Sequence, residues 1–89
     1  MAERQATIAS SSGLHARPAK LFVQAVQEKK IPVTIAVPGG KDLNAGSILS
    51  LIGLGASKGT VVTLKAEGEG ADAALDDLVA LLETDLDAQ

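Results

Sequence analysis

Two segments of the chain place apolar residues at the spacing of one helical face. Between Ala16 and about Glu28 the apolar positions follow an i, i+3, i+4, i+7 pattern, and polar side chains fill the opposite face. The apolar positions are Ala19, Phe22, Val23 and Val26, and the polar ones include Lys20, Gln24 and Gln27. The second segment, 71–82, aligns Ala71, Ala74, Leu75, Leu78, Leu81 and Leu82 on one stripe. Both segments predict amphipathic helices.

Three other segments alternate apolar and polar residues with the period of two that is typical of a half-buried strand. The clearest is IPVTIAV at 31–37, in which Pro32 indicates a strand start or an edge position. Residues 4–9 alternate weakly and residues 60–67 clearly. The PGG sequence at 38–40 is typical of a turn, so KDLN at 41–44 is predicted to be a partner strand that closes a hairpin.

The short apolar segment SILSLI at 47–52 predicts one or two helical turns. It opens with Ser47, whose hydroxyl can cap a helix by accepting a hydrogen bond from a backbone N–H two or three residues later. The apolar side chains of this segment point to nearly all sides of the predicted helix, and there are more of them than one core-facing side needs. We expect Leu51 to be buried, with Ile48 as the second candidate for burial. Leu49 and Ile52 are then expected to form an exposed apolar patch of the kind that docks partners.

The glycines at 53, 55 and 59 predict a loop before the strand at 60–67. The predicted order is therefore β-α-β-β-α-β-α in one domain spanning 1–89. Half-exposed strands favour an antiparallel sheet with one face in water. The predicted fold class is α+β: an open-faced β-sandwich, in which three helices cover one face of a four-stranded antiparallel sheet.

Composition limits the chemistry that the chain can support. The absence of cysteine excludes disulfides and thiolate metal sites. A single histidine disfavours a metal site built from imidazoles. We therefore expect neither a metal nor a cofactor. Residues 1–66 hold all eight Lys and Arg with three acids, whereas 67–89 hold eight acids and no base. The net charge of −3 and the single aromatic residue disfavour nucleic-acid binding. No apolar run reaches the roughly 20 residues of a membrane helix, and the charged start MAERQATIAS is unlike a signal peptide. We therefore expect a cytoplasmic protein without direct membrane insertion.

The single histidine precedes the first predicted helix, in the block GLHARPA at 13–19. A helix tolerates Pro18 in its first turn, so it is predicted to begin beside His15. Backbone N–H groups such as those of Ala16 and Arg17 would then form an anion site with the helix dipole. This positive end disfavours protonation of the imidazole, which leaves a neutral nucleophile, and Arg17 could hold phosphoryl oxygens. On the pattern alone, a surface or capping role for a lone histidine stays open.

Other segments give weaker signals. GLGASKG at 53–59 does not have the spacing of a phosphate-binding loop and is interpreted as a turn. Asp76 and Asp77 fall on the solvated face of the last helix. No second base stands near His15 in the sequence, so a self-sufficient enzyme is not expected.

The blocks GLHARPA at 13–19 and GSILSLIGLGASKGT at 46–60, with the length and element order, resemble the HPr family. These are the histidine-containing phosphocarrier proteins of the bacterial phosphoenolpyruvate-dependent sugar phosphotransferase system. The resemblance implies a phosphoryl carrier rather than an enzyme. In it, His15 accepts the phosphoryl group at Nδ1 from enzyme I and donates it to a sugar-specific enzyme IIA, with Arg17 as the supporting cation. A relay between successive partners is easiest for a monomer.

The resemblance also implies a docking face on two helices. Its residues are Ala16, Lys20 and Gln24 on the first helix and Ile48, Leu49 and Ile52 on the second. Ser47 aligns with a serine that an ATP-dependent HPr kinase phosphorylates in some bacteria. Gly46 replaces the lysine that usually precedes this serine, so we expect capping to be the role of Ser47. A phosphate on Ser47 would oppose docking beside Leu49 and Ile52 by desolvation and charge repulsion.

Two other function classes stay open at this point. A regulatory binding module could use the same face without relaying phosphate. An independent small hydrolase, such as a phosphatase, is disfavoured because it lacks a second catalytic group. An all-helical histidine phosphotransfer domain is disfavoured by the strands predicted at 31–37 and 60–67.

Overall fold

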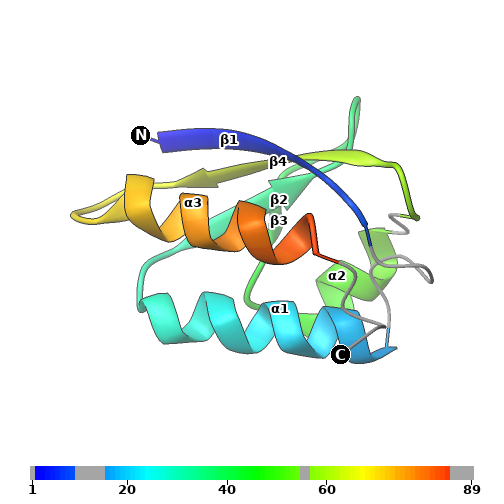
Figure 1. Ribbon diagram of the computed structural model, residues 1–89, viewed down its shortest axis with the longest axis horizontal. Coiled ribbons are helices and arrows are strands. Elements are labelled where there is room, and N and C mark those ends of the chain that lie inside the picture. The colour runs from blue at the N-terminus through cyan, green and yellow to red at the C-terminus, as the bar shows by residue number, and fades with distance from the viewer. Residues whose placement is uncertain (1, 10–15, 55–56, 85–89) are drawn as a thin grey trace.

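The computed structural model describes residues 2–9, 16–54 and 57–84, with the backbone alone at 16 and 17. The elements in chain order are β1 (Ala2–Thr7), α1 (Ala16–Lys29), β2 (Val33–Ala36), β3 (Leu43–Asn44), α2 (Ile48–Leu54), β4 (Val61–Ala66) and α3 (Ala71–Leu82). This is the predicted order, and the four strands form one open sheet with the three helices beside it (Figure 1). The predicted fold class is confirmed.

The strands lie in the order β1-β4-β2-β3, and every neighbouring pair is antiparallel. β4 pairs with β1 along six residues, from Ala2 opposite Ala66 to Thr7 opposite Val61. β2 lies inside the sheet between β4 and β3, so the edge position that Pro32 had suggested is wrong and the strand-start position is right. β2 begins at Val33, directly after the proline, because a residue without an N–H cannot join a ladder that has neighbours on both sides.

The core lies between the helices and one face of the sheet. Alternate strand residues point into it, among them Ala6, Val33, Ile35, Val62 and Leu64, each at most 2% exposed. The predicted apolar faces of the two long helices are buried against these residues, and Phe22, the single aromatic residue, is fully buried. α1 and α3 run antiparallel beside one another, and α2 packs against α1 (Figure 1). This packing leaves the other face of the sheet uncovered by helices.

Several predicted boundaries were wrong. β2 spans 33–36 rather than 31–37, and β4 spans 61–66 rather than 60–67. β1 spans 2–7 rather than 4–9 because its ladder follows β4 to Ala66, although Ile8 still donates its N–H to the Thr60 carbonyl. β3 is shorter than the predicted 41–44. α2 continues through Gly53 to Leu54, so a glycine expected to open a loop lies in the last turn of the helix.

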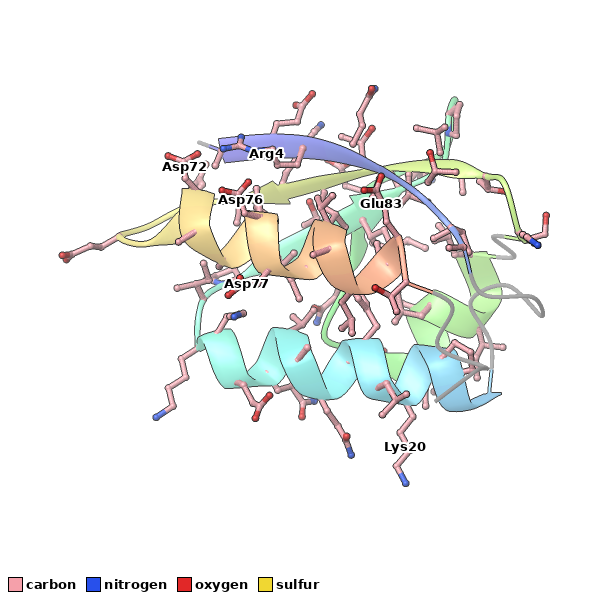
Figure 2. All side chains as sticks on the ribbon, in the orientation of Figure 1. Arg4, Lys20, Asp72, Asp76, Asp77 and Glu83 are labelled. Carbon is pink, nitrogen blue, oxygen red and sulfur yellow. The ribbon has the colours of Figure 1, made fainter. Side chains whose placement is uncertain are left out.

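Ion pairs join the acidic last helix to the basic part of the chain. Arg4 of β1 donates hydrogen bonds to Asp72 Oδ1 at 3.1 Å and to Asp76 Oδ1 at 3.2 Å. Both hydrogen bonds raise the pKa of Arg4, and the bond to Asp76 has the larger effect. Lys29 at the end of α1 bonds Asp77 Oδ2 at 2.7 Å. Figure 2 shows Asp72 and Asp76 directed toward Arg4 and Asp77 directed toward α1. Asp76 and Asp77 are exposed, as predicted. Their ion pairs link α3 to β1 and to α1.

Candidate functional site

The first helix begins at the residue that follows the single histidine. α1 starts at Ala16, and Pro18, its third residue, is fully buried against the core. A proline in the first turn costs the helix no hydrogen bond, because the first N–H groups have no intrahelical acceptor. The predicted helix start is confirmed. His15 itself lies outside the described residues, as does the side chain of Arg17.

The start of α1 is electrostatically suited to an anion. Its first turn contains no acidic side chain that would neutralise the positive end of the helix dipole. Apart from Pro18, which has no N–H, the residues of this turn present backbone N–H groups that the helix leaves without intrahelical partners. A phosphate placed there would interact with both the dipole and these donors.

Polar side chains follow α1 away from this start. Lys20 and Gln24 are exposed and lie one turn apart on the helix face opposite the buried residues. Lys20 extends into solvent (Figure 2) and has no salt-bridge partner among the residues that the structure describes. α1 therefore offers one positive charge and one amide on the surface that continues from its N-terminus.

The second helix adds an exposed apolar patch. Leu49 is 79% exposed, Ile52 46% and Ile48 37%, whereas Leu51 is fully buried. The predicted exposure of Leu49 and Ile52 and the predicted burial of Leu51 are confirmed. The suggested burial of Ile48 is wrong, because Leu51 and the half-buried Leu54 make the contacts of this short helix with the core. We use the term docking surface, after the role predicted for it, for Lys20 and Gln24 of α1 with Ile48, Leu49 and Ile52 of α2. Ala16 was also predicted to belong to this surface, but its side chain lies outside the part of the chain that the structure describes.

Ser47 occupies the capping position that the sequence predicted. α2 begins at Ile48, and the backbone N–H of Ser50 donates to Ser47 Oγ at 3.4 Å. The Ser47 carbonyl accepts the first hydrogen bond of the helix, from the N–H of Leu51 at 3.1 Å. The hydroxyl therefore satisfies one of the N–H groups that a helix start leaves without a partner.

Sequence reasoning missed two side chains at the turn before α2. Asn44 Oδ1 accepts a hydrogen bond from the Gly46 N–H at 2.8 Å, and Gln27 Nε2 of α1 donates to the Gly46 carbonyl at 3.3 Å. The first contact is an Asx turn, which asparagine two residues before a glycine makes readily, so NAG at 44–46 contained a usable signal. The second joins residues 19 positions apart, and no local pattern indicates it.

In the rest of the described surface, no other group of residues forms a clearer candidate site. A shallow hollow of about 260 Å³ on the uncovered face of the sheet is lined by Pro32, Thr34, Asp42, Lys65, Ala66 and Glu67. It includes none of the predicted site residues, and its Lys65 and Asp42 pair with each other at 3.4 Å. Within 2–9, 16–54 and 57–84, no three His, Cys, Asp or Glu side chains gather as metal ligands would. None of the described helices is long and apolar enough to cross a membrane.

Comparison with known proteins gives consistent matches along the chain. Residues 2–84 match the family model described as the PTS HPr component phosphorylation site. The phosphocarrier protein HPr of Streptomyces coelicolor is 46% identical over 82 residues, which cover 92% of this chain and 88% of the relative. The crystal structure of HPr from Thermoanaerobacter tengcongensis superposes with a TM-score of 0.86 at 41% identity, covering 93% and 92% of the two chains. A structure of the HPr dimer from the same organism superposes with a TM-score of 0.70 at 41% identity, covering 93% and 94%.

Proposed function

The chain belongs to the HPr family of phosphocarrier proteins of the phosphotransferase system, and we propose that it carries its phosphoryl group on His15. In this proposal, phospho-enzyme I is the donor and a sugar-specific enzyme IIA is the acceptor. The observation that carries it is the start of α1 at Ala16, directly after the one histidine, within the matched residues.

The chemistry follows from the helix start. Nδ1 of a neutral His15 attacks the phosphorus of phospho-enzyme I, so a P–N bond forms to the imidazole as the bond between phosphorus and enzyme I breaks. The backbone N–H groups that begin at Ala16 stabilise the phosphoryl oxygens, and the Arg17 guanidinium adds positive charge. In the second step the acceptor of enzyme IIA attacks the same phosphorus, the P–N bond breaks, and the imidazole is regenerated. The protein therefore ends each cycle unchanged and needs no cofactor.

The docking surface supplies recognition for both steps. Ile48, Leu49 and Ile52 provide apolar contact, and Lys20 with Gln24 provides polar contact beside the start of α1. One surface can serve two partners in turn if each leaves before the other binds. This sequence of encounters favours a monomeric carrier, and we propose that it acts in the cytoplasm, as the family resemblance implies.

A relay experiment tests the proposal. The chain is phosphorylated with radiolabelled phosphoenolpyruvate and a catalytic amount of enzyme I, separated from enzyme I, and then mixed with enzyme IIA. We expect an acid-labile, alkali-stable label that moves to enzyme IIA, and no label on a His15→Ala variant. A label that stays on the chain in the presence of active enzyme IIA would instead support a regulatory binding module. Release of inorganic phosphate from phosphate esters by the isolated chain would support a hydrolase.

Ser47 has a second, regulatory role in this proposal only where an HPr kinase is present. Its hydroxyl lies at the first turn of α2, one residue before Ile48 and two before Leu49. Phosphorylation there would place a dianion beside the apolar part of the docking surface and weaken partner binding. Incubation with an HPr kinase and ATP, followed by peptide mass spectrometry, tests whether Ser47 is a substrate.

A further inference from the structure

The docking surface is divided between two helices, so its shape depends on how α2 is held against α1. α2 has seven residues, and Leu51 is its one buried side chain. Leu54, at the other end of the helix, is half-buried against the core. Apolar contact has little directional preference, because the hydrophobic effect depends on area rather than orientation. The orientation of the exposed residues Ile48, Leu49 and Ile52 therefore also depends on the turn that leads into α2.

Hydrogen bonds fix that turn at consecutive residues. The Ala45 N–H donates to the Val33 carbonyl of β2 at 3.0 Å, and Ala45 is fully buried. The Gly46 N–H donates to Asn44 Oδ1 at 2.8 Å, and the Gly46 carbonyl accepts from Gln27 Nε2 at 3.3 Å. Both backbone polar groups of Gly46 are thus bonded to side chains, and one of those side chains belongs to α1.

The side chain of Gln27 is not part of the core, so core packing does not explain its hydrogen bond to the Gly46 carbonyl. Its side chain is exposed, and it follows Lys20 and Gln24 on the polar face of α1 at the i, i+4, i+7 spacing. Within the described part of the chain, it makes the one side-chain hydrogen bond between α1 and the residues that lead into α2. The turn also lies close to α1, since a Cβ added at Gly46 would stand 3.7 Å from Val26 Cγ1 of that helix.

We propose that Gln27 is a positioning residue that orients α2 against α1 through the Gly46 carbonyl and so sets the geometry of the docking surface. The partners concerned are those of the proposed carrier function, on which this part of the inference rests. Gln27 does not touch the reacting atoms, so its loss changes the encounter with a partner and leaves the transfer step intact.

Kinetics with enzyme I separates these two effects. The rate of phosphoenolpyruvate-dependent phosphorylation is measured against the concentration of the chain. For Gln27→Ala we expect KM to rise about three- to tenfold, the range for loss of one neutral hydrogen bond, with kcat within about twofold of wild type. Gln27→Glu keeps the shape of the side chain but cannot donate to a carbonyl, so it should resemble Gln27→Ala. Gln27→Lys restores a donor and should recover most of the wild-type KM.

The charge changes need a matched control on the same helix. Glu28 is exposed on α1 and lies outside the docking surface, and Glu28→Lys makes the same change from Glu to Lys at a residue with no hydrogen bond to Gly46. We expect the difference between Glu and Lys to be larger at 27 than at 28. Equal differences at the two positions would attribute the result to charge alone and overturn the proposal, as would a Gln27→Ala variant with the wild-type KM.

A structural measurement keeps this inference distinct from the carrier function. Backbone amide shifts and hydrogen exchange are compared by NMR between wild type and Gln27→Ala. We expect changes at Gly46 and through α2, with α3 unchanged. Unchanged α2 amides would overturn the inference even if phosphoryl transfer is confirmed. If the wild-type chain accepts no phosphate, the carrier proposal fails, and these amide shifts alone decide whether Gln27 orients α2.

Discussion

Two leucines of α2 lie in opposite environments. Leu51 is fully buried in the core, whereas Leu49, two positions earlier, is 79% exposed. An exposed leucine in so short a helix adds little to folding, because its side chain stays in water in the folded state. Side-chain direction in α2 thus separates a residue that holds the helix from one that a partner can contact.

The first prediction compares the truncation of these two leucines. Leu51→Ala should lower the free energy of unfolding by about 2–5 kcal/mol, because it opens a cavity where α2 is anchored. Leu49→Ala should change it by less than about 0.5 kcal/mol but raise KM with enzyme I about three- to tenfold. Urea denaturation and initial rates provide the two measurements.

Val61→Ala is the control for the truncation of an exposed apolar residue. Val61 is 40% exposed and lies on β4, away from the docking surface. Its truncation should leave KM unchanged. A Leu49→Ala variant with the KM of wild type would remove Leu49 from the docking surface.

A second prediction concerns the cap at Ser47. Ser47→Ala removes the acceptor of the Ser50 N–H and should destabilise the protein by about 0.5–2 kcal/mol. Ser47→Asp should restore this stability, since aspartate caps a helix as well as serine does. The same aspartate should raise KM with enzyme I because it places a negative charge beside the apolar patch. Thermal unfolding and phosphorylation rates check the two effects.

Ser50→Ala is the matched control, because the hydrogen bond uses the Ser50 backbone and survives the substitution. It should leave the cap intact and the stability close to that of wild type. If Ser47→Ala proves as stable as Ser50→Ala, the capping role is wrong.

At the scale of elements, the docking surface combines one helix that is charged with one that is apolar. Lys20 is the one charged residue in the described docking surface, and three of the other four members are Ile48, Leu49 and Ile52. Apolar burial depends little on ionic strength, whereas the attraction of exposed charges is screened by salt. If the proposed docking is right, the balance between these helices determines how salt affects partner binding.

We expect KM with enzyme I to rise by less than about tenfold between about 0.05 and 0.5 M NaCl. Lys20→Gln should weaken this dependence, whereas Lys65→Gln should not, because Lys65 lies on the uncovered sheet face and pairs with Asp42. Steady-state rates in a salt series make the measurement. A rise of about a thousandfold would show that charge dominates and contradict the apolar role of α2.

The elements were predictable where their patterns were long and local. The spacing of Ala19, Phe22, Val23 and Val26 located α1, and alternation located β4, because periodicity directly reflects burial. The end of β1 was misplaced because its limits follow from pairing with β4, which is distant in the sequence. For the same reason, the hydrogen bond from Gln27 to the Gly46 carbonyl could not be predicted from the sequence.

At the scale of the whole molecule, the fold places the proposed chemistry and the recognition surface at neighbouring helices. The sheet and α3 form the support: Arg4 bonds Asp72 and Asp76, and Lys29 bonds Asp77. The basic residues bonded in this way lie in β1 and at the far end of α1, so these pairs leave the positive start of α1 to an incoming anion. A small chain can then act as a carrier because its partners supply the catalysis.

The central claim is that one imidazole before α1 holds the transferred group. The most direct measurement is mass spectrometry of the chain after incubation with phosphoenolpyruvate and a catalytic amount of enzyme I, intact and after proteolysis at alkaline pH. We expect one added phosphoryl group, located on the peptide that contains His15, and none on a His15→Ala variant that retains the wild-type circular dichroism. A phosphoryl group on the folded His15→Ala variant, or on a wild-type peptide without His15, would contradict the account.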